Sequence, residues 1–549
     1  MRDIFFRRQT NILSAAFVIM VTYGLSHFIG LFKTRMLISQ FFGSGAQLLD
    51  VYYAALVIPD TIFQLLIIGA LSAAFIPIFT KNLTQSKEKA WHMTASVMNC
   101  IFIVFLIVSG VVFFLAPSLA RLIGPGFSGS QLATMVSLLR IMLVAQMFFS
   151  VSGFLTSIIQ SHQRFLIPAM APIVYNLGII LGIVFLSKYV GIFGPAIGMV
   201  IGAALHMLIQ IPLAYKLGFR FKLILDFKDS GVREVLSLIP PRSLALGIDQ
   251  IEQFVATMLA SLLIPGSLSL FNVAKLLYAV PTLLFGATIG QAALPTLSQI
   301  SALKDRVEFI RTLVNSFLQV SFLALPASMI LIVLRVPIVR IVFGAKTFPW
   351  SATILTGQTL AVLAVSASFY AVMQLIVRGF YALHDTKTPL VVGLFSAIFN
   401  AVTGYFYVTA FNMGILGIAL AISSTAIIET TIMTYLLLRK LDKLPEIAAG
   451  FKSLLRMIFV SFVTGVCLWV PMRLLDQFIF DTTRTLPLVA LTMITSLIGL
   501  AVYLGLSKLM RISQLGTFVA LINRVKDWRR IINSNPPSEA LIIPASDQN

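Results

Sequence analysis

The sequence predicts an all-α polytopic membrane protein with about 14 transmembrane helices. Apolar stretches of roughly 20 residues or more recur along the chain, and short loops separate them. Hydrophobic residues make up 58% of the 549 residues and charged residues only 11%, against roughly 25% charged residues in a soluble domain. The loops alternate between rich and poor in Lys and Arg, as loops on opposite sides of a membrane do.

The distribution of basic residues and the positions of the cysteines argue against a nucleic-acid-binding protein and against a disulfide-rich or metal-binding one. A formal net charge of +20 would suggest nucleic-acid binding in a soluble protein, but here the basic residues crowd the loops, where they set orientation. We therefore expect no nucleic-acid partner. Cys100 and Cys467 both lie inside apolar stretches, so we expect neither a disulfide framework nor a metal knuckle.

The first apolar stretch, near 11–32, is too long for the core of a signal peptide, and we interpret it as a retained span. The other expected spans lie near 50–78, 92–117, 132–159, 165–186, 191–215, 234–263, 267–298, 311–335, 352–379, 388–410, 413–438, 453–472 and 485–508. An even number of spans puts both termini on one side. Placing them in the cytoplasm of a bacterium puts the basic loops there, as expected for a multi-pass protein of the cytoplasmic (inner) membrane. These basic loops are 81–89, 216–233, 304–311 and 439–456.

The chain also repeats itself at low similarity. Residues 190–197 (VGIFGPAI) resemble 413–420 (MGILGIAL), and the segments 157–168 and 377–389 occupy equivalent places before them. An apolar element from Pro59 to Pro77 has a shorter counterpart from Pro281 to Pro295. The offset covers about six helices, an even count, so the two halves should point the same way. The alternative is chance similarity among helices rich in Gly, Ala and Ile.

The repeat predicts two pseudo-symmetric six-helix lobes followed by two C-terminal helices. Residues 511–534 mix apolar and basic residues and are typical of a helix lying on the membrane surface. We expect these parts in order: an N-lobe of helices 1–6 (1–216), a cytoplasmic linker (217–233), a C-lobe of helices 7–12 (234–440), helices 13–14 (441–510), and a cytoplasmic amphipathic helix with a disordered tail (511–549).

Polar residues inside apolar spans are functional candidates, because lipid tolerates them poorly. The first span and its exit carry His27, Lys33 and Arg35, and Asp50 begins the second. His27 could instead be a helix-packing residue, and the two cations could simply extend to the headgroups.

A second group of polar residues lies in the seventh and eighth spans. Arg242, Asp249 and Glu252 fall near one helix face, where they could form an ion pair plus a spare acid, or only join helices together. Lys275 has no acid near it in sequence, so it is the best single candidate for touching an anionic substrate.

Enzymatic motifs are missing from the sequence. It has no GxxxxGK[ST] phosphate loop, no HExxH and no GxSxG elbow. We therefore expect a transporter without a cofactor, and any uphill transport would depend on the membrane potential or a monovalent cation.

The run 378–389 (RGFYALHDTKTP) resembles the signature of the MurJ (MviN) lipid II flippases, in the multidrug/oligosaccharidyl-lipid/polysaccharide exporter superfamily. Segments 58–79, 123–130, 160–176 and 218–242 agree, and the resemblance covers roughly residues 10 to 510. It implies fourteen helices, two lobes around a cavity, and two terminal helices that form a groove for a polyprenyl tail. The matching motif residues are Arg378, Asp385, Thr386, Lys387 and Pro389.

The resemblance also implies which residues bind the substrate, although this chain differs from the family pattern at several of those positions. Family members commonly read IPNxxRRLFAEGAFS in the second span, and this chain reads IPDTIFQLLIIGALS. Phe63 and Gln64 thus replace an Arg pair, and Ile68 replaces a Glu. The expected substrate-binding residues are His27, Lys33, Arg35, Asp50, Arg242 and Lys275.

An ion-coupling site is implied in some relatives by an acid in the seventh helix and an Asn in the eleventh. The matching residues here are Asp249, with Glu252 beside it, and Asn400. Gly404 stands where a second acid of that pattern would be.

The resemblance implies a flippase that moves the peptidoglycan precursor lipid II from the inner to the outer leaflet by alternating access. Lipid II and cell-wall synthesis proteins are the expected partners. The alternatives are a flippase for another polyprenyl-linked saccharide, a drug or cation antiporter, and a non-transporting membrane scaffold. The antiporter is disfavoured because a cation exporter needs an acidic cavity, whereas the intramembrane residues here are mostly basic or paired.

Overall fold

The computed structural model describes residues 12–519 except 69–70, 72–74, 304, 442–444 and 483, and this part of the chain contains helices and no strands. Within it, twelve helices are long and apolar enough to cross a membrane. The prediction of an all-α, multi-pass membrane protein is therefore confirmed. The expected spans near 11–32 and 234–263 are helical too, but they are not among the twelve, so a total of fourteen stays a prediction. Most of the amphipathic segment 511–534 and the tail after it lie outside the described residues.

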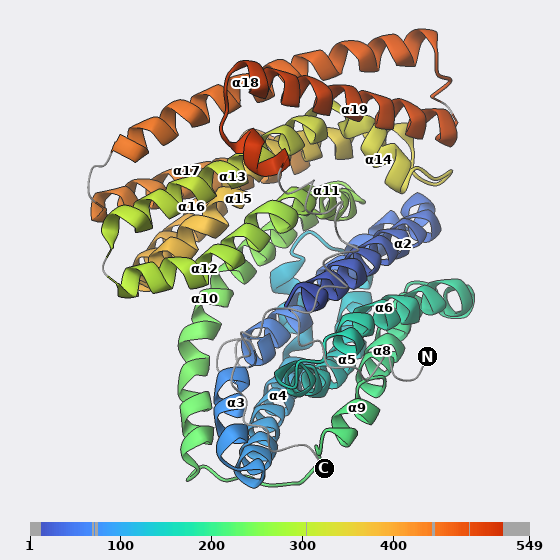
Figure 1. The fold of residues 1–549 in the computed structure, drawn as a ribbon. Helices are drawn as coiled ribbons and strands as arrows, with labels where there is room; N and C mark the ends of the chain where they lie inside the picture. Colours follow the sequence, from blue (N-terminus) through green and yellow to red (C-terminus); the bar gives the residue numbers. More distant parts are fainter. Residues whose placement is uncertain are drawn as a thin grey trace. The chain divides into compact units, whose positions relative to one another are not determined.

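The helices form two compact units, one ending at Phe254 and one beginning at Val255 (Figure 1). The expected boundaries at 216, 233 and 440 stay predictions. The first unit contains α2 (Ile12–Phe63), η1 (Gln64–Ile68), α3 (Ile76–Gln85), α4 (Lys87–Ile123), α5 (Gly129–Ser161), α6 (Leu166–Leu181), η3 (Gly182–Leu186), α7 (Ser187–Val190), α8 (Phe193–Leu208), α9 (Ile211–Lys216) and most of α10 (Ser230–Ser261).

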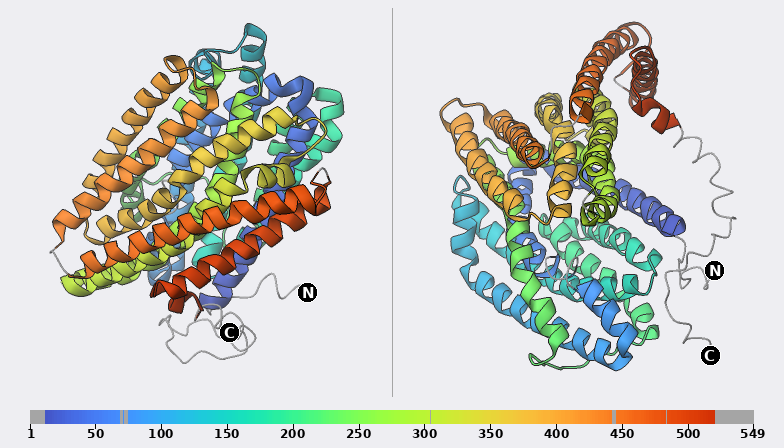
Figure 2. Two further views of the ribbon diagram at one scale, coloured as in Figure 1. Left: turned by 90° about the horizontal axis from the view of Figure 1, so that it is seen from above. Right: turned by 60° about the vertical axis from the view of Figure 1, so that its left-hand side comes forward.

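The second unit continues from the end of α10. It contains α11 (Ser267–Pro281), η4 (Thr282–Ala287), α12 (Thr288–Ala302), α13 (Arg306–Val333), α14 (Arg335–Phe343), α15 (Trp350–Ala382), α16 (Lys387–Thr409), α17 (Gly414–Lys440), α18 (Pro445–Phe478) and α19 (Thr485–Leu509). The two C-terminal helices, α18 and α19, lie side by side, and α18 packs on α13 (Figure 2).

The longest helix is two helices joined at a kink. As one straight rod, the 52 residues of α2 would measure roughly 78 Å, more than twice the thickness of a bilayer core. Gly45 breaks the helix with φ −107° and ψ 15°, and a membrane-spanning segment begins there, Gly45–Ile68. The kink divides α2 into a first half, which carries Lys33, and a second half, which carries Asp60.

Glycines bring α6 and η3 close to α8. A Cβ on Gly178 would lie 2.3 Å from the Cα of Gly202, and one on Gly182 would lie 2.7 Å from the Cα of Gly198. Backbones can approach this closely only where side chains are absent, as in other small-residue contacts between membrane helices. These contacts fix α6, which also packs on α2.

Backbone geometry supports the internal repeat. Gly191 and Gly414 have φ values of 58° and 56°, and they belong to the two segments that resemble each other. Gln163 and His384, both with φ 57°, occupy the turns before α6 and α16. The π-helical segments η1 and η4 lie in the two elements matched by Pro59–Pro77 and Pro281–Pro295. A positive φ is uncommon for residues other than glycine, so its recurrence at Gln163 and His384 argues against chance similarity.

The glycine contact predicts an asymmetric response to a single methyl group. A Cβ on Gly198 would lie 2.7 Å from the carbonyl oxygen of Gly178, whereas one on Gly110 meets nothing within 4 Å. We expect Gly198→Ala to lower the free energy of unfolding by about 1–3 kcal/mol through overpacking, and Gly110→Ala to leave it nearly unchanged. Thermal unfolding of the purified protein in detergent measures both, and equal effects would contradict the close packing.

Candidate functional site

The first unit holds a group of polar side chains around α2, which we call the α2 charge cluster: Lys33, Asp60, Gln146 and Tyr175. Lys33 and Asp60 interact electrostatically, although along a straight helix they would lie roughly 40 Å apart. The kink at Gly45 therefore folds the second half of α2 back toward the first. The α5 and α6 helices, which pack on α2, supply the other two residues.

The cluster has a definite geometry. Gln146 Nε2 donates to Asp60 Oδ1 at 2.6 Å, and the ammonium of Lys33 lies 6.0 Å from the centre of the Tyr175 ring. Lys33 and Tyr175 are half-buried, Gln146 is buried and Asp60 is exposed. A cation and an anion thus face the same polar region inside a membrane-spanning unit, which marks a candidate binding site.

Aromatic rings extend the cluster along α2. Phe149 lies between two other rings, with its centre 5.7 Å from that of Phe63 and 4.9 Å from that of Tyr175. Phe63 stands where the resemblance places an Arg, so an aromatic contact takes the place of one cation of the family's pair. The site next to Lys33 is consequently less basic and more apolar than the family pattern implies.

The other predicted residues of the first unit differ in their exposure. His27 is exposed, Arg35 is half-buried and Asp50 is 3% exposed. In α10, Asp249 is exposed and Glu252 is half-buried. The side chain of Arg242 lies outside the described residues, and so does its expected pairing with Asp249. These assignments stay predictions.

In the second unit, Lys275 is half-buried on α11. Asn400 is buried in α16, and its Nδ2 has no hydrogen-bond partner in the part of the chain that the structure describes. A Cβ on Gly404 would lie 3.0 Å from Leu259, so this position has little room for a second acid. Ion coupling through these residues stays a prediction.

The 378–389 motif forms a joint between helices. Asp385 Oδ1 accepts hydrogen bonds from the backbone N–H groups of Lys387 (3.1 Å) and Thr388 (3.0 Å), at the start of α16. Its Oδ2 accepts from the Thr388 hydroxyl at 2.6 Å and from the ammonium of Lys440, at the end of α17. Asp385 therefore caps one helix and ties it to another.

The remaining motif residues surround this joint. Arg378 and Pro389 are half-buried, and Thr386 and Lys387 are exposed. His384, with φ 57°, makes the left-handed turn that directs the chain into α16. Burial raises the pKa of Asp385, but the hydrogen bonds from Lys440 and Thr388 outweigh it and lower that pKa to about 2.

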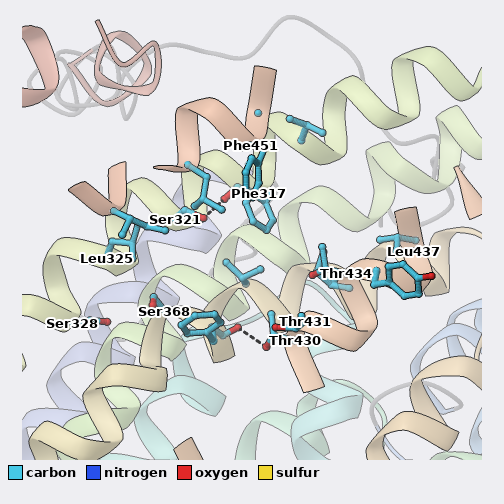
Figure 3. A pocket seen from close by; sticks show the side chains of 18 of the residues that line it. Phe317, Ser321, Leu325, Ser328, Ser368, Thr430, Thr431, Thr434, Leu437 and Phe451 are labelled. Atoms are coloured by element: carbon cyan, nitrogen blue, oxygen red, sulfur yellow. Dashed lines mark hydrogen bonds between the residues drawn. The ribbon is translucent and has the colours of Figure 1, made fainter. Parts of the chain in front are cut away.

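A large apolar cavity lies in the second unit. It has a volume of about 630 Å³, and its walls come from α13, α15, α17 and α18 (Figure 3). Two hydroxyl groups on its walls donate to their own helices: Ser321 to the carbonyl of Phe317 at 2.8 Å and Thr431 to the carbonyl of Ile427 at 2.7 Å. Thr430 instead donates across to the carbonyl of Phe369 at 3.1 Å. The cavity presents mainly carbon to an occupant, which suits a hydrocarbon chain.

Metal ligation finds no support in the described residues, which contain no group of three or more His, Cys, Asp and Glu side chains suited to an ion.

The family model described as "Lipid II flippase MurJ" matches residues 38–490. The chain belongs to this family. The Lipid II flippase MurJ of Burkholderia cenocepacia is 28% identical over 426 residues, 76% of this chain and 81% of that protein. The Probable lipid II flippase MurJ of Thermotoga maritima is 26% identical over 480 residues, 87% of this chain and 93% of that protein.

Solved structures agree with the MurJ assignment. A lipid II flippase MurJ in an inward closed conformation matches with a TM-score of 0.74 and 25% identity, covering 90% of this chain and 98% of that one. An inward-facing multidrug resistance MATE transporter of the MOP superfamily matches with a TM-score of 0.65, covering 78% of this chain and 96% of that one, at 14% identity. The second likeness concerns the fold alone. The family match and the likeness to the solved MurJ structure place the chain among transporters.

Sequence reasoning missed three members of the α2 charge cluster: Asp60, Gln146 and Tyr175. Asp60 could have been found as an ionisable residue inside an apolar span. Gln146 carries no such signal, because its role depends on how α5 packs against α2.

The helix joint predicts an acid-sensitive contribution to stability. Because folding lowers the pKa of Asp385 from 3.8 to about 2, the charged joint stabilises the protein above about pH 4 and loses this contribution as the pH falls toward 2. Asp385→Asn should therefore unfold more readily at neutral pH, and the difference from the unmodified chain should shrink between about pH 4 and pH 2. Thermal unfolding across this range measures it. Asp476→Asn is the control, because that exposed carboxylate accepts from the hydroxyl of Thr482 and joins no second helix; an equal effect of both variants would contradict the assignment.

Proposed function

We propose that the chain moves lipid II from the inner to the outer leaflet of the bacterial cytoplasmic membrane by alternating access. Both termini lie in the cytoplasm in this proposal. The observation that carries it is the MurJ family match over residues 38–490, and the likeness to a solved MurJ structure over 90% of the chain supports it.

The substrate has two parts with opposite chemistry, and the chain offers features suited to each. The pyrophosphate-linked headgroup is anionic, and Lys33 and Lys275 are half-buried cations. Lys275 lies in a helix long and apolar enough to cross a membrane. Ammonium groups in a low-dielectric site bind phosphate oxygens strongly. The polyprenyl tail is a long hydrocarbon, and the cavity beside α18 is lined mainly by carbon. The two lysines would bind the headgroup as it crosses the membrane, while the tail stays in an apolar environment.

The energy source in this proposal is the membrane itself. Membrane potential acts on every charge that crosses, at roughly 2.3 kcal/mol per charge per 100 mV. A monovalent cation gradient is the alternative, with Asp249, Glu252 and Asn400 as the coupling residues. Cell-wall synthesis proteins are the expected partners in either case.

A second candidate is a flippase for another polyprenyl-linked saccharide. Phe63 and its neighbouring rings favour it, because they replace the cation that the family pattern places beside the headgroup. The shared requirement is still an anionic head and an apolar tail.

Complementation of a bacterium depleted of its own MurJ tests the proposal, scoring survival together with lipid II on the outer leaflet. We expect rescue by the full chain and loss of rescue with Lys275→Ala or Lys33→Ala at unchanged membrane levels, because each substitution removes a cation for the pyrophosphate. Lys188→Ala, at an exposed basic residue, is the control and should still rescue. Failure of a well-inserted chain would favour another saccharide, and indifference to both lysine substitutions would favour a scaffold.

If the apolar cavity beside α18 holds the polyprenyl tail, filling it should slow the transfer of lipids with a long tail. Ser328 lines this cavity and is 5% exposed, so Ser328→Phe should fill part of it. We expect slower transfer of lipid II with its full tail and little change for an analogue with a shortened tail, measured in reconstituted vesicles. Ser328→Ala, which removes only the hydroxyl, is the control. Equal slowing of both lipids would contradict a role in holding the tail.

A further inference from the structure

We propose that Asp60 is the counter-ion of Lys33 in the empty protein and that the pyrophosphate of the substrate replaces it. This inference rests on the proposed function, since it concerns how the same cation receives its anion. In it, Asp60 is a positioning residue that sets the strength with which Lys33 holds a phosphate.

Asp60 is held in place independently of Lys33. It belongs to the span Gly45–Ile68, where an isolated carboxylate would be costly. One of its oxygens accepts the 2.6 Å hydrogen bond from Gln146 Nε2, and Gln146 is 2% exposed in α5. Because a buried amide on another helix fixes the carboxylate, Asp60 can keep its position when Lys33 moves.

Lys33 is held more loosely. Its ammonium faces the ring of Tyr175 at 6.0 Å and interacts with the charge of Asp60. The described residues provide it with no direct ion pair and no hydrogen bond. A half-buried ammonium in a membrane helix needs an anion nearby, and Asp60 supplies that charge from beyond hydrogen-bond distance. The three N–H donors of Lys33 therefore stay free for phosphate oxygens.

The separation of the two charges has a consequence for transport. A close ion pair would have to be broken before a phosphate could bind, whereas the separated pair lets the phosphate take the donors while Asp60 repels it. Gln146 Nε2 already donates to Asp60, and Gln146 Oε1 is an acceptor, which cannot form a hydrogen bond with a phosphate oxygen. Asp60 thus lowers the affinity of the site for the pyrophosphate headgroup. A carrier must release its substrate as well as bind it, and this lower affinity permits release.

Two phenols also interact with Asp60 electrostatically, Tyr52 on α2 and Tyr175 on α6. A tyrosine side chain carries no charge at neutral pH. Lys33 supplies the opposite charge that Asp60 faces.

A double-mutant cycle tests the exchange. Binding of a polyprenyl pyrophosphate to the purified full chain is measured for the unmodified protein, Asp60→Asn, Lys33→Gln and the double variant, with lipid II transfer in vesicles measured beside it. We expect Asp60→Asn to bind roughly tenfold more tightly and to transfer more slowly, Lys33→Gln to bind weakly, and Asp60→Asn to change little in the Lys33→Gln background. Asp60→Glu should restore the affinity of the unmodified chain, and Asp476→Asn is the distant control.

The outcomes separate this inference from the proposed function. Equal effects of Asp60→Asn in both backgrounds, or weaker binding, would overturn the exchange even if lipid II is transferred. Strong coupling in the binding cycle without lipid II transfer would support the exchange and contradict the proposed function. If Asp60→Asn does not fold, Asp60→Ser provides a second neutral variant for the same cycle.

Discussion

The cost of placing charge inside a membrane is the constraint on which the rest of this structure depends. A charged side chain in a span must be compensated or used, and the first unit brings Lys33 and Asp60 into one polar region although they lie on two halves of a kinked helix. This requires the break at Gly45 and the packing of α5 and α6 on α2. The close glycine contacts between α6 and α8 in turn fix α6. Helix packing in the first unit thus serves the placement of a few charges.

The charged side chains and the apolar cavity lie in different units of the protein. The α2 charge cluster lies in the first unit and offers a cation, an acid and aromatic rings. The apolar cavity lies wholly within the second unit, between α13, α15, α17 and α18. An amphipathic lipid with an anionic head needs both environments, because a phosphate is costly in hydrocarbon and a polyprenyl chain is costly in water.

The sequence predicted the helical membrane fold because apolar length and loop charge are local properties. It predicted the repeat because residues 190–197 resemble 413–420, and the positive φ values of Gly191 and Gly414 at matched places support that prediction. It also found Lys33, but not its pairing with Asp60, since that depends on how a helix folds back. The 378–389 motif was predicted as a functional signature, and the structure gives Asp385 a capping and tying role that only the approach of Lys440 reveals. The resemblance implies a tail groove in the two terminal helices, whereas the apolar cavity is lined by α13, α15, α17 and α18. Its position depends on how these four helices pack, which no local sequence pattern encodes. Arg242, expected beside Asp249, has a side chain outside the described residues.

Direct transfer of lipid II by the purified chain tests the central claim most directly. Vesicles containing the full chain and lipid II would be probed with an enzyme that acts only on headgroups in the outer leaflet, with protein-free vesicles and a zwitterionic phospholipid as references. We expect the protein to make the inner pool of lipid II accessible while leaving the phospholipid distribution unchanged. Inaccessible lipid II in vesicles with correctly folded protein, or equal transfer of both lipids, would contradict it.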